Sequence, residues 1–183
     1  MSTIVMTPDH IACDHAYYPS TFPQTMAVDP GRSKIFISED DSFLYAAVGD
    51  YDPDIAMSSD CENMVRDLIA IIEQKFAEEP GLSIDFLKTD HADIISRYLK
   101  YLDDMTFIVA GTNRYVIMYS QKTEQLVVAH ASKFVGGGTG GAFAEGLLHG
   151  GMDIRSIWKP LNRLCGTSSI ERTIVDLSTF KEV

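Results

Sequence analysis

The stretch STIVMTPDHIACDH, residues 2–15, predicts two short strands joined by a tight turn. Apolar residues run through both halves, and Thr7-Pro8-Asp9 between them is a turn triplet. The first half starts with a small hydroxyl residue, Ser2, directly behind the initiator methionine. The second half returns along the first and reaches an acid, Asp14. The hairpin therefore brings this carboxylate within reach of the start of the chain.

The composition fits one compact globular domain over residues 1–183, with 45% hydrophobic and 22% charged residues. The net charge of -11 argues against nucleic acid as the main partner, because phosphate binding needs clustered Lys and Arg. It argues equally against anionic membrane surfaces. The same charge suits a soluble, self-repelling surface or a basic partner.

The three cysteines, Cys13, Cys61 and Cys165, give an odd count without metal-ligand spacing. We therefore expect a reducing compartment, with Cys13 as a buried thiol in its apolar run. The N-terminus has neither the basic start nor the apolar core of a signal peptide. No apolar run approaches the roughly 20 residues of a membrane span. These features predict a cytoplasmic protein, and we expect no metal and no cofactor.

A second hairpin is predicted after a polar, proline-containing stretch. Residues 34–38 (KIFIS) and 42–49 (SFLYAAVG) flank the turn Glu39-Asp40-Asp41. The second of these strands is apolar on both faces, which predicts that both faces are covered.

Two helices are predicted next. The form Ser59-x-x-Glu62 is a capping box, and Pro80-Gly81 ends the helix behind it. A further helix is expected to start near Asp90. The apolar residues at helical spacing in the first helix are Val65, Leu68, Ile69, Ile72 and Phe76.

Three strands are predicted in the second half, at residues 105–112 (MTFIVAGT), 114–120 (RYVIMYS) and 125–131 (QLVVAHA). A glycine-rich loop, VGGGTGG (135–141), then leads into a small-residue helix, AFAEGLLHG (142–150).

The chain closes with one more helix and one more strand. Asp153 opens the helix, Pro160 kinks it, and RTIVDL (172–177) is the last strand. Runs of strands followed by runs of helices predict stacked layers rather than alternating βαβ units. Two sheets face to face with helices outside would cover the strands on both sides.

Removal of Met1 would make Ser2 the first residue, with its hydroxyl and its own α-amine on one atom framework. The amine has an unperturbed pKa of about 7.7–8.0, so it can act as a base near neutral pH. A hydroxyl activated by an N-terminal amine is a known nucleophile arrangement. Lys34, at the head of the next strand, would lower the pKa of the hydroxyl, and Asp14 would orient that lysine. The backbone at Ala46 would supply an oxyanion donor.

In order along the chain, these segments resemble the N-terminal nucleophile hydrolases of the proteasome β-subunit type, most of all the bacterial HslV-like and phage-encoded members. MSTIV resembles the start at which Met removal exposes the nucleophile, with Ser2 where Thr is usual. IACDH, SKIFIS and FLYAAVGD resemble the strands with the Asp, the Lys and the oxyanion backbone, here Asp14, Lys34 and Ala46. VGGGTGGAFAEGLL resembles the Gly-Ser-Gly loop and helix near the active site, with Thr139 at the Ser position.

The resemblance implies an α+β fold: a four-layer αββα sandwich with two mainly antiparallel sheets between helices. It implies hydrolysis of amide bonds in a peptide or protein substrate by the first residue. It also implies a homo-oligomer, such as a ring, with a separate ATPase as a further partner.

The chain departs from the family pattern in the late region LNRLCGTSS. The family often has an Asp there, followed three residues on by a Ser. Asn162 or Gly166 falls near the Asp position, and Ser168 or Ser169 near the Ser position, so the acid is missing. This loss, and Ser in place of Thr at the start, favour a second hypothesis: a non-catalytic member that keeps the fold for assembly or partner binding.

Three other patterns receive structural interpretations. Residues 136–141 satisfy G-x-G-x-x-G, but βαβ alternation and an acid about 20 residues on are missing. We expect these glycines to let the backbone pass close to the active-site strand. The acids of GDYDPD (49–54) are expected to form a solvated turn rather than a cation site. His15 follows Asp14 and so points to the opposite face, where we expect a surface or an interface.

Overall fold

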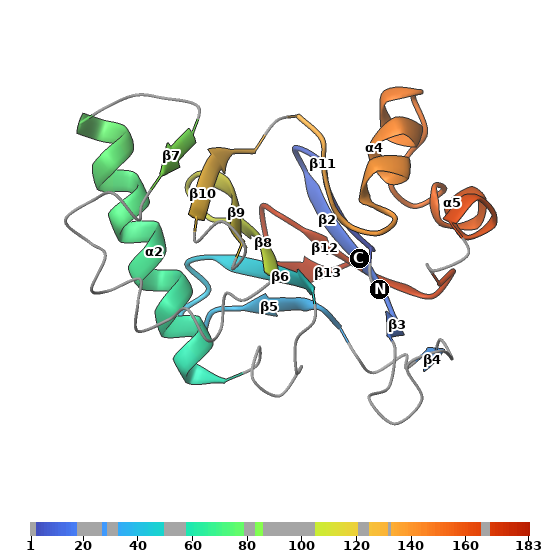
Figure 1. Cartoon of the computed structure of the whole chain (residues 1–183). Helices are drawn as coiled ribbons and strands as arrows, with labels where there is room; N and C mark the ends of the chain where they lie inside the picture. Colours follow the sequence, from blue (N-terminus) through green and yellow to red (C-terminus); the bar gives the residue numbers. More distant parts are fainter. Residues whose placement is uncertain are drawn as a thin grey trace.

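The opening hairpin lies at the centre of a five-stranded antiparallel sheet in the computed structural model (Figure 1). β1 (Thr3–Met6) pairs with β2 (His10–Asp14). Thr7 closes the turn, because its N–H donates to the His10 carbonyl over 2.8 Å and its hydroxyl accepts the His10 N–H over 3.0 Å. The predicted hairpin is confirmed. The sheet order is β11-β1-β2-β12-β13, with β11 at Val135–Gly138, β12 at Arg172–Asp176 and β13 at Lys181–Glu182.

The structure describes nine ranges of the chain, and all structural statements concern these ranges: 3–17, 27–28, 33–49, 58–78, 83–85, 105–120, 125–131, 133–165 and 169–183. Within them, no helix is long and apolar enough to cross a membrane. Three predicted features lie outside the described residues, namely the helix near Asp90, the acids of residues 50–54 and the Pro80-Gly81 break.

The second predicted hairpin is present as β5 (Ile35–Ile37) and β6 (Leu44–Gly49), and it belongs to a six-stranded antiparallel sheet. Ser38 closes its turn by donating its N–H to the Phe43 carbonyl over 2.9 Å. The sheet order is β5-β6-β8-β9-β10-β7, with β7 at Ser83–Asp85, β8 at Met105–Ala110, β9 at Arg114–Ser120 and β10 at Gln125–His130.

Four short strands were not predicted: β3 (Ala16–Tyr17), β4 (Ala27–Val28), β7 and β13. Each has only two or three residues. A segment of this length cannot display the alternation that identifies a strand in a sequence. β3 and β4 pair with each other, whereas β7 and β13 are edge strands of the two main sheets.

α2 (Ser59–Glu78) covers the outer face of the six-stranded sheet (Figure 1). The predicted capping box is wrong, because the helix begins at Ser59, one residue earlier than the box requires. Ser58 is the cap, and its hydroxyl accepts the Cys61 N–H over 3.2 Å. Glu62 instead pairs with Arg66 one turn on, over 2.9 Å. The apolar stripe packs with the sheet in one buried cluster that includes Met64, Val65, Leu68, Ile72, Tyr45, Phe107, Tyr115 and Ile117.

α4 (Gly141–His149) and α5 (Trp158–Cys165) cover the outer face of the five-stranded sheet. The last helix begins at Trp158 and not at Asp153, which caps a turn by accepting the Arg155 N–H over 2.7 Å. Pro160 therefore lies in the first turn of α5, where a missing N–H costs no helical hydrogen bond, and the predicted kink is wrong. The two helices and the five-stranded sheet share one buried cluster: Val5, Ala12, Ala144, Leu148, Ile154, Ile157, Trp158, Leu161 and Ile174.

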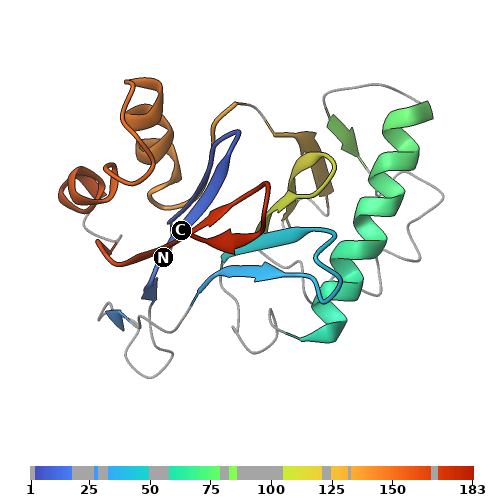
Figure 2. The ribbon, with the colours of Figure 1, turned by 180° about the vertical axis from the view of Figure 1, so that it is seen from behind.

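The two sheets pack face to face, which completes a four-layer αββα sandwich of the α+β class. α2 lies on one side, and α4 and α5 lie on the other, in both views of the molecule (Figures 1 and 2). The layer between the sheets is a third buried cluster: Ile4, Met6, Ile11, Cys13, Ile35, Leu44, Ala46, Val48, Ile108, Ala110, Val135 and Val175. The predicted fold class is confirmed.

The glycine-rich segment is a strand and not the predicted loop. β11 pairs with β1 along its length, from Thr3 opposite Gly138 to Met6 opposite Val135. A Cβ on Gly136 would lie 2.2 Å from the Gly141 carbonyl oxygen, so the bare backbone is what lets β11 touch the start of α4. The glycines were expected to let the backbone pass close to the active-site strand; β11 does pair with β1, but the approach that requires Gly136 is the one to the start of α4.

Candidate active site

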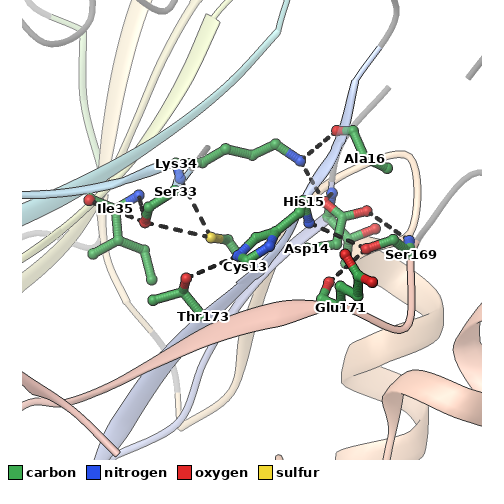
Figure 3. A network of polar contacts seen from close by, with 11 residues as sticks. Cys13, Asp14, His15, Ala16, Ser33, Lys34, Ile35, Ser169, Glu171 and Thr173 are labelled. Atoms are coloured by element: carbon green, nitrogen blue, oxygen red, sulfur yellow. Dashed lines mark hydrogen bonds and ion pairs between the residues drawn. The ribbon is translucent and has the colours of Figure 1, made fainter. Parts of the chain in front are cut away.

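A buried ion pair joins the two sheets at the end of β2. The Lys34 Nζ contacts Asp14 Oδ1, and the side chains are 4% and 0% exposed (Figure 3). Asp14 is the last residue of β2, and Lys34 directly precedes β5. The same Nζ donates to the Ala16 carbonyl over 2.7 Å. A buried ammonium needs such partners, because an unpaired charge in this position would be strongly destabilising.

Two backbone N–H groups also bind the Asp14 carboxylate. The Thr3 N–H donates to Oδ1 over 3.0 Å, and the Ser169 N–H donates to Oδ2 over 3.2 Å. Burial raises the pKa of Asp14 above its ordinary value, while the Lys34 charge and the two N–H groups oppose that shift. The carboxylate therefore ties together the N-terminal strand, the lysine and the segment before β12.

The Lys34 backbone is held as firmly as its side chain. Its N–H donates to Cys13 Sγ over 3.4 Å, and its carbonyl accepts the Ala47 N–H over 3.3 Å. Cys13 is fully buried, as predicted, and this burial raises the pKa of its thiol. The thiol acts here as a weak acceptor that fixes the start of β5, and this contact between distant segments has no signal in the local sequence.

Ser169 lies at the candidate site, and its Oγ accepts the His15 N–H over 3.2 Å and donates to the Glu171 carbonyl. Of the two serines considered for this position, Ser168 lies outside the described residues. Of the two residues considered for the position of the missing acid, the structure again describes only one. Asn162 belongs to α5, and Gly166 lies outside the described residues.

The other predicted residues are placed as follows. Ser2 lies outside the described residues, and Thr3, its neighbour in sequence, is fully buried. Thr139 is exposed and follows Gly138, the partner of Thr3 in the sheet. Thr139 is therefore at the same sheet end as the start of β1.

Ala46 is fully buried in β6, where it pairs with Ile35 of β5 and Ile108 of β8. Because the Ala47 N–H donates to Lys34, alternation along an antiparallel strand turns the Ala46 N–H toward β8. The oxyanion role of Ala46 stays a prediction, and a substrate oxygen would compete with β8 for this N–H.

His15 is buried within the single chain, with 6% of its surface exposed, so the expected position at a surface or an interface is wrong. Its ring contacts Thr173 of β12, and its backbone N–H contacts Ser169 and Glu171, all from the far end of the chain. Alternation along β2 indicates a face, but it cannot indicate what covers that face.

Glu145 of α4 is a further polar residue that the sequence patterns did not single out. Its carboxylate accepts the N–H of Gly136, in the edge strand β11, over 2.5 Å. The contact fastens the glycine strand to the helix that follows it. Among the described residues, no group of three or more His, Cys, Asp or Glu side chains is arranged to hold a metal ion.

Comparison with known proteins gives a result at the level of fold only. No model of a known protein family matches the sequence, and no curated protein matches it. Among solved structures, eukaryotic HslV from Trypanosoma brucei is similar with a TM-score of 0.51 and 16% identity, over 94% of this chain and 96% of that one.

Two further solved structures are similar to this chain in fold. BPH from Thiobacillus denitrificans, solved in complex with epoxomicin, has a TM-score of 0.52 and 15% identity, over 96% of this chain and 98% of that one. A Gly-1 mutant of Anbu from Hyphomicrobium sp. strain MC1 has a TM-score of 0.52 and 11% identity, over 100% of this chain and 85% of that one. This chain therefore has the αββα sandwich fold of HslV-like proteins.

Proposed function

We propose that this chain is a proteasome-like N-terminal serine hydrolase that cleaves amide bonds, with Ser2 as nucleophile once Met1 has been removed. One observation carries the proposal. The Lys34 ammonium and the Thr3 N–H converge on the same oxygen of Asp14. The buried cation thus lies beside the strand end that a single peptide bond joins to Ser2, where it would favour the ionised hydroxyl. The shared fold supports the same function at the level of architecture.

The proposed reaction uses the two functional groups of one residue. The Ser2 amine takes the hydroxyl proton as Oγ attacks the carbonyl carbon of the substrate amide. The tetrahedral intermediate collapses, the C–N bond breaks, and the amine passes its proton to the leaving amine. An ester on Ser2 remains. A water molecule then attacks this ester, and the amine takes a proton from the water. Oγ recovers that proton as the carboxylic acid leaves.

The neighbouring residues would have supporting roles. Lys34 lowers the pKa of the nucleophile, and Asp14 orients Lys34. Ser169 fixes Asp14 through its N–H. The backbone of Ala46 would donate to the oxyanion, and Thr139 would lie beside the N-terminus.

The test begins with the intact mass of the purified native chain. A mass short by one methionine residue leaves Ser2 with a free amine, and the chain is then incubated with epoxomicin, the compound bound by the BPH structure of the same fold. We expect one covalent adduct on the wild type and none on Ser2→Ala. Ser2→Thr is the matched variant, since it keeps a hydroxyl at this position, and it should be labelled.

Retention of Met1, or equal labelling of Ser2→Ala, contradicts the proposal. The missing late acid then favours the second candidate, a non-catalytic protein that uses the fold for assembly or partner binding. We also propose a homo-oligomer of this fold that takes a peptide or protein as substrate, with a separate ATPase as a further partner. A monomer in sedimentation at micromolar concentration would contradict that assembly.

A further inference from the structure

The imidazole of His15 is buried with one of its two nitrogens paired. Nε2 lies 2.9 Å from Thr173 Oγ1. Nδ1 is buried and has no hydrogen-bond partner within the described part of the chain. The two ends of this contact are 158 residues apart in the sequence, so the imidazole joins the end of the first hairpin to β12.

This arrangement favours one form of the ring. The neutral tautomer with its proton on Nε2 donates to Thr173 and leaves only a lone pair unpaired on Nδ1. Protonation would put an N–H on Nδ1 with no acceptor, and burying an unpaired donor with a positive charge costs far more than burying an unpaired lone pair. His15 is therefore neutral in this structure.

The charged groups around the ring oppose one another. Burial lowers the pKa of His15 below its ordinary value, and the positive charge of Lys34 lowers it further. Glu171, Asp14 and Glu182 raise it, but by less than burial and Lys34 lower it, so the pKa remains below 6.5. The Asp14–Lys34 pair would thus receive a second cation if His15 were protonated.

The backbone of His15 connects this ring to the candidate site. Its N–H donates to Ser169 Oγ and to the Glu171 carbonyl, each over 3.2 Å (Figure 3). Ser169 in turn donates its own N–H to Asp14 Oδ2. The short segment 169–171 therefore contacts both the His15 backbone and the Asp14 carboxylate, and the His15 ring contacts Thr173, two residues beyond that segment in β12.

We propose that His15 is a positioning residue: in its neutral form it anchors the Ser169–Glu171 segment against Asp14, and in mildly acidic solution its protonation releases that segment. Its effect on catalysis rests on the proposed function, whereas its effect on the segment does not. The folded state prefers the neutral ring, so the unfolded chain binds the proton more readily. The stability that this preference supplies is complete above pH 6.5 and is lost as the pH falls below that value.

The experiment compares the full-length wild type with His15→Gln, whose amide can donate to Thr173 but cannot titrate. His10→Gln is the matched control, because His10 is the first residue of β2, the strand that ends just before His15, and its side chain is partly exposed. The first readout is the titration of each histidine by NMR, with His15 assigned from the missing signal in His15→Gln. The second is amide exchange of Ser169, whose N–H binds Asp14.

We expect the His15 signal to titrate below pH 6.5. At about pH 5, protection of the Ser169 amide should be about tenfold lower in the wild type than in His15→Gln, and equal at about pH 7.5. His10→Gln should behave as the wild type. The Asp14 titration is common to all three chains and cancels in the comparison.

A His15 titration at or above pH 6.5, or equal Ser169 protection in wild type and His15→Gln at about pH 5, would overturn the proposal. Epoxomicin labelling against pH adds an activity arm, in which the acid limb should lie at lower pH in His15→Gln. If no chain is labelled at any pH, the proposed function fails, and the NMR readouts still decide the role of His15.

Discussion

The Lys34–Asp14 pair is the most deeply buried pair of opposite charges among the described residues. Such a pair is weak support for stability as a whole, since desolvation offsets much of the attraction, but removal of one partner leaves an uncompensated buried charge. Asp14 also accepts two backbone N–H groups, so its carboxylate orders the site even apart from the lysine. Buried polar networks of this kind occur at active sites and in structural cores alike, so the catalytic role of this one stays a prediction.

We predict that Lys34→Met and Asp14→Asn each lower the free energy of unfolding by about 3–5 kcal/mol. The double variant should lose clearly less than the sum, because it leaves neither charge unpaired. Urea unfolding at neutral pH measures all four corners of this cycle. Additive losses would show that the two side chains do not stabilise each other.

The three thiols should differ in reactivity, because the thiolate is the reactive form. Burial raises the pKa of Cys61 to about 11 and also raises that of Cys13. At about pH 8 both therefore stay protonated and covered, whereas Cys165 is half-buried. We predict that a thiol reagent labels Cys165 in the native chain, and labels Cys13 and Cys61 only after unfolding. Native labelling of Cys61 at a rate similar to that of Cys165 would contradict this prediction.

The contact between β11 and α4 depends on two glycines, Gly136 and Gly141, whose backbones touch. The Cβ of an alanine at Gly136 would lie 2.2 Å from a carbonyl oxygen, and a backbone atom cannot rotate away as a side chain does. The same contact includes the Glu145 carboxylate on the Gly136 N–H. The start of α4 and the strand beside β1 therefore form one unit, and Thr139 lies in the turn that joins them.

We predict that Gly136→Ala lowers the free energy of unfolding by about 3 kcal/mol, because overpacking against backbone forces β11 and α4 apart. Gly146→Ala is the matched control. Gly146 lies in α4, the helix that Gly136 contacts, and has open space where the Cβ would be, so this substitution should stabilise the chain by up to about 1 kcal/mol. Thermal unfolding of both variants checks this pair. Equal effects would mean that the close approach is not what glycine provides at position 136.

The molecule as a whole carries a formal charge of -11 over 183 residues. Self-repulsion of this size opposes the compact state, and salt screens it over the Debye length. We predict that the melting temperature rises by a few degrees between about 0.05 M and about 0.5 M NaCl. Potassium chloride should give the same rise if screening is the cause. A fall in the melting temperature would mean that surface ion pairs such as Arg66–Asp40 outweigh the net repulsion.

The sequence alone determined the elements whose signals are local. Both hairpins, α2 and the strands β8 to β10 follow from apolar periodicity and turn residues within a few positions of each other. The order of strands and helices then predicted the layers, the places of Asp14 and Lys34 at strand ends singled these residues out, and the resemblance supplied the four-layer sandwich. The ion pair between these two residues is present in the structure. Their catalytic roles stay predictions.

Only the tertiary structure decided what depends on distant segments. β11 has three glycines and therefore no side-chain periodicity, and it becomes a strand because β1 lies beside it. Ser58 rather than Ser59 caps α2, since the packing of the helix sets where its first turn begins. His15 is buried where its ring contacts Thr173 and its backbone contacts Ser169, and both return from more than 150 residues away. Local patterns indicate which face a side chain takes, and only the folded chain determines which residues lie against that face.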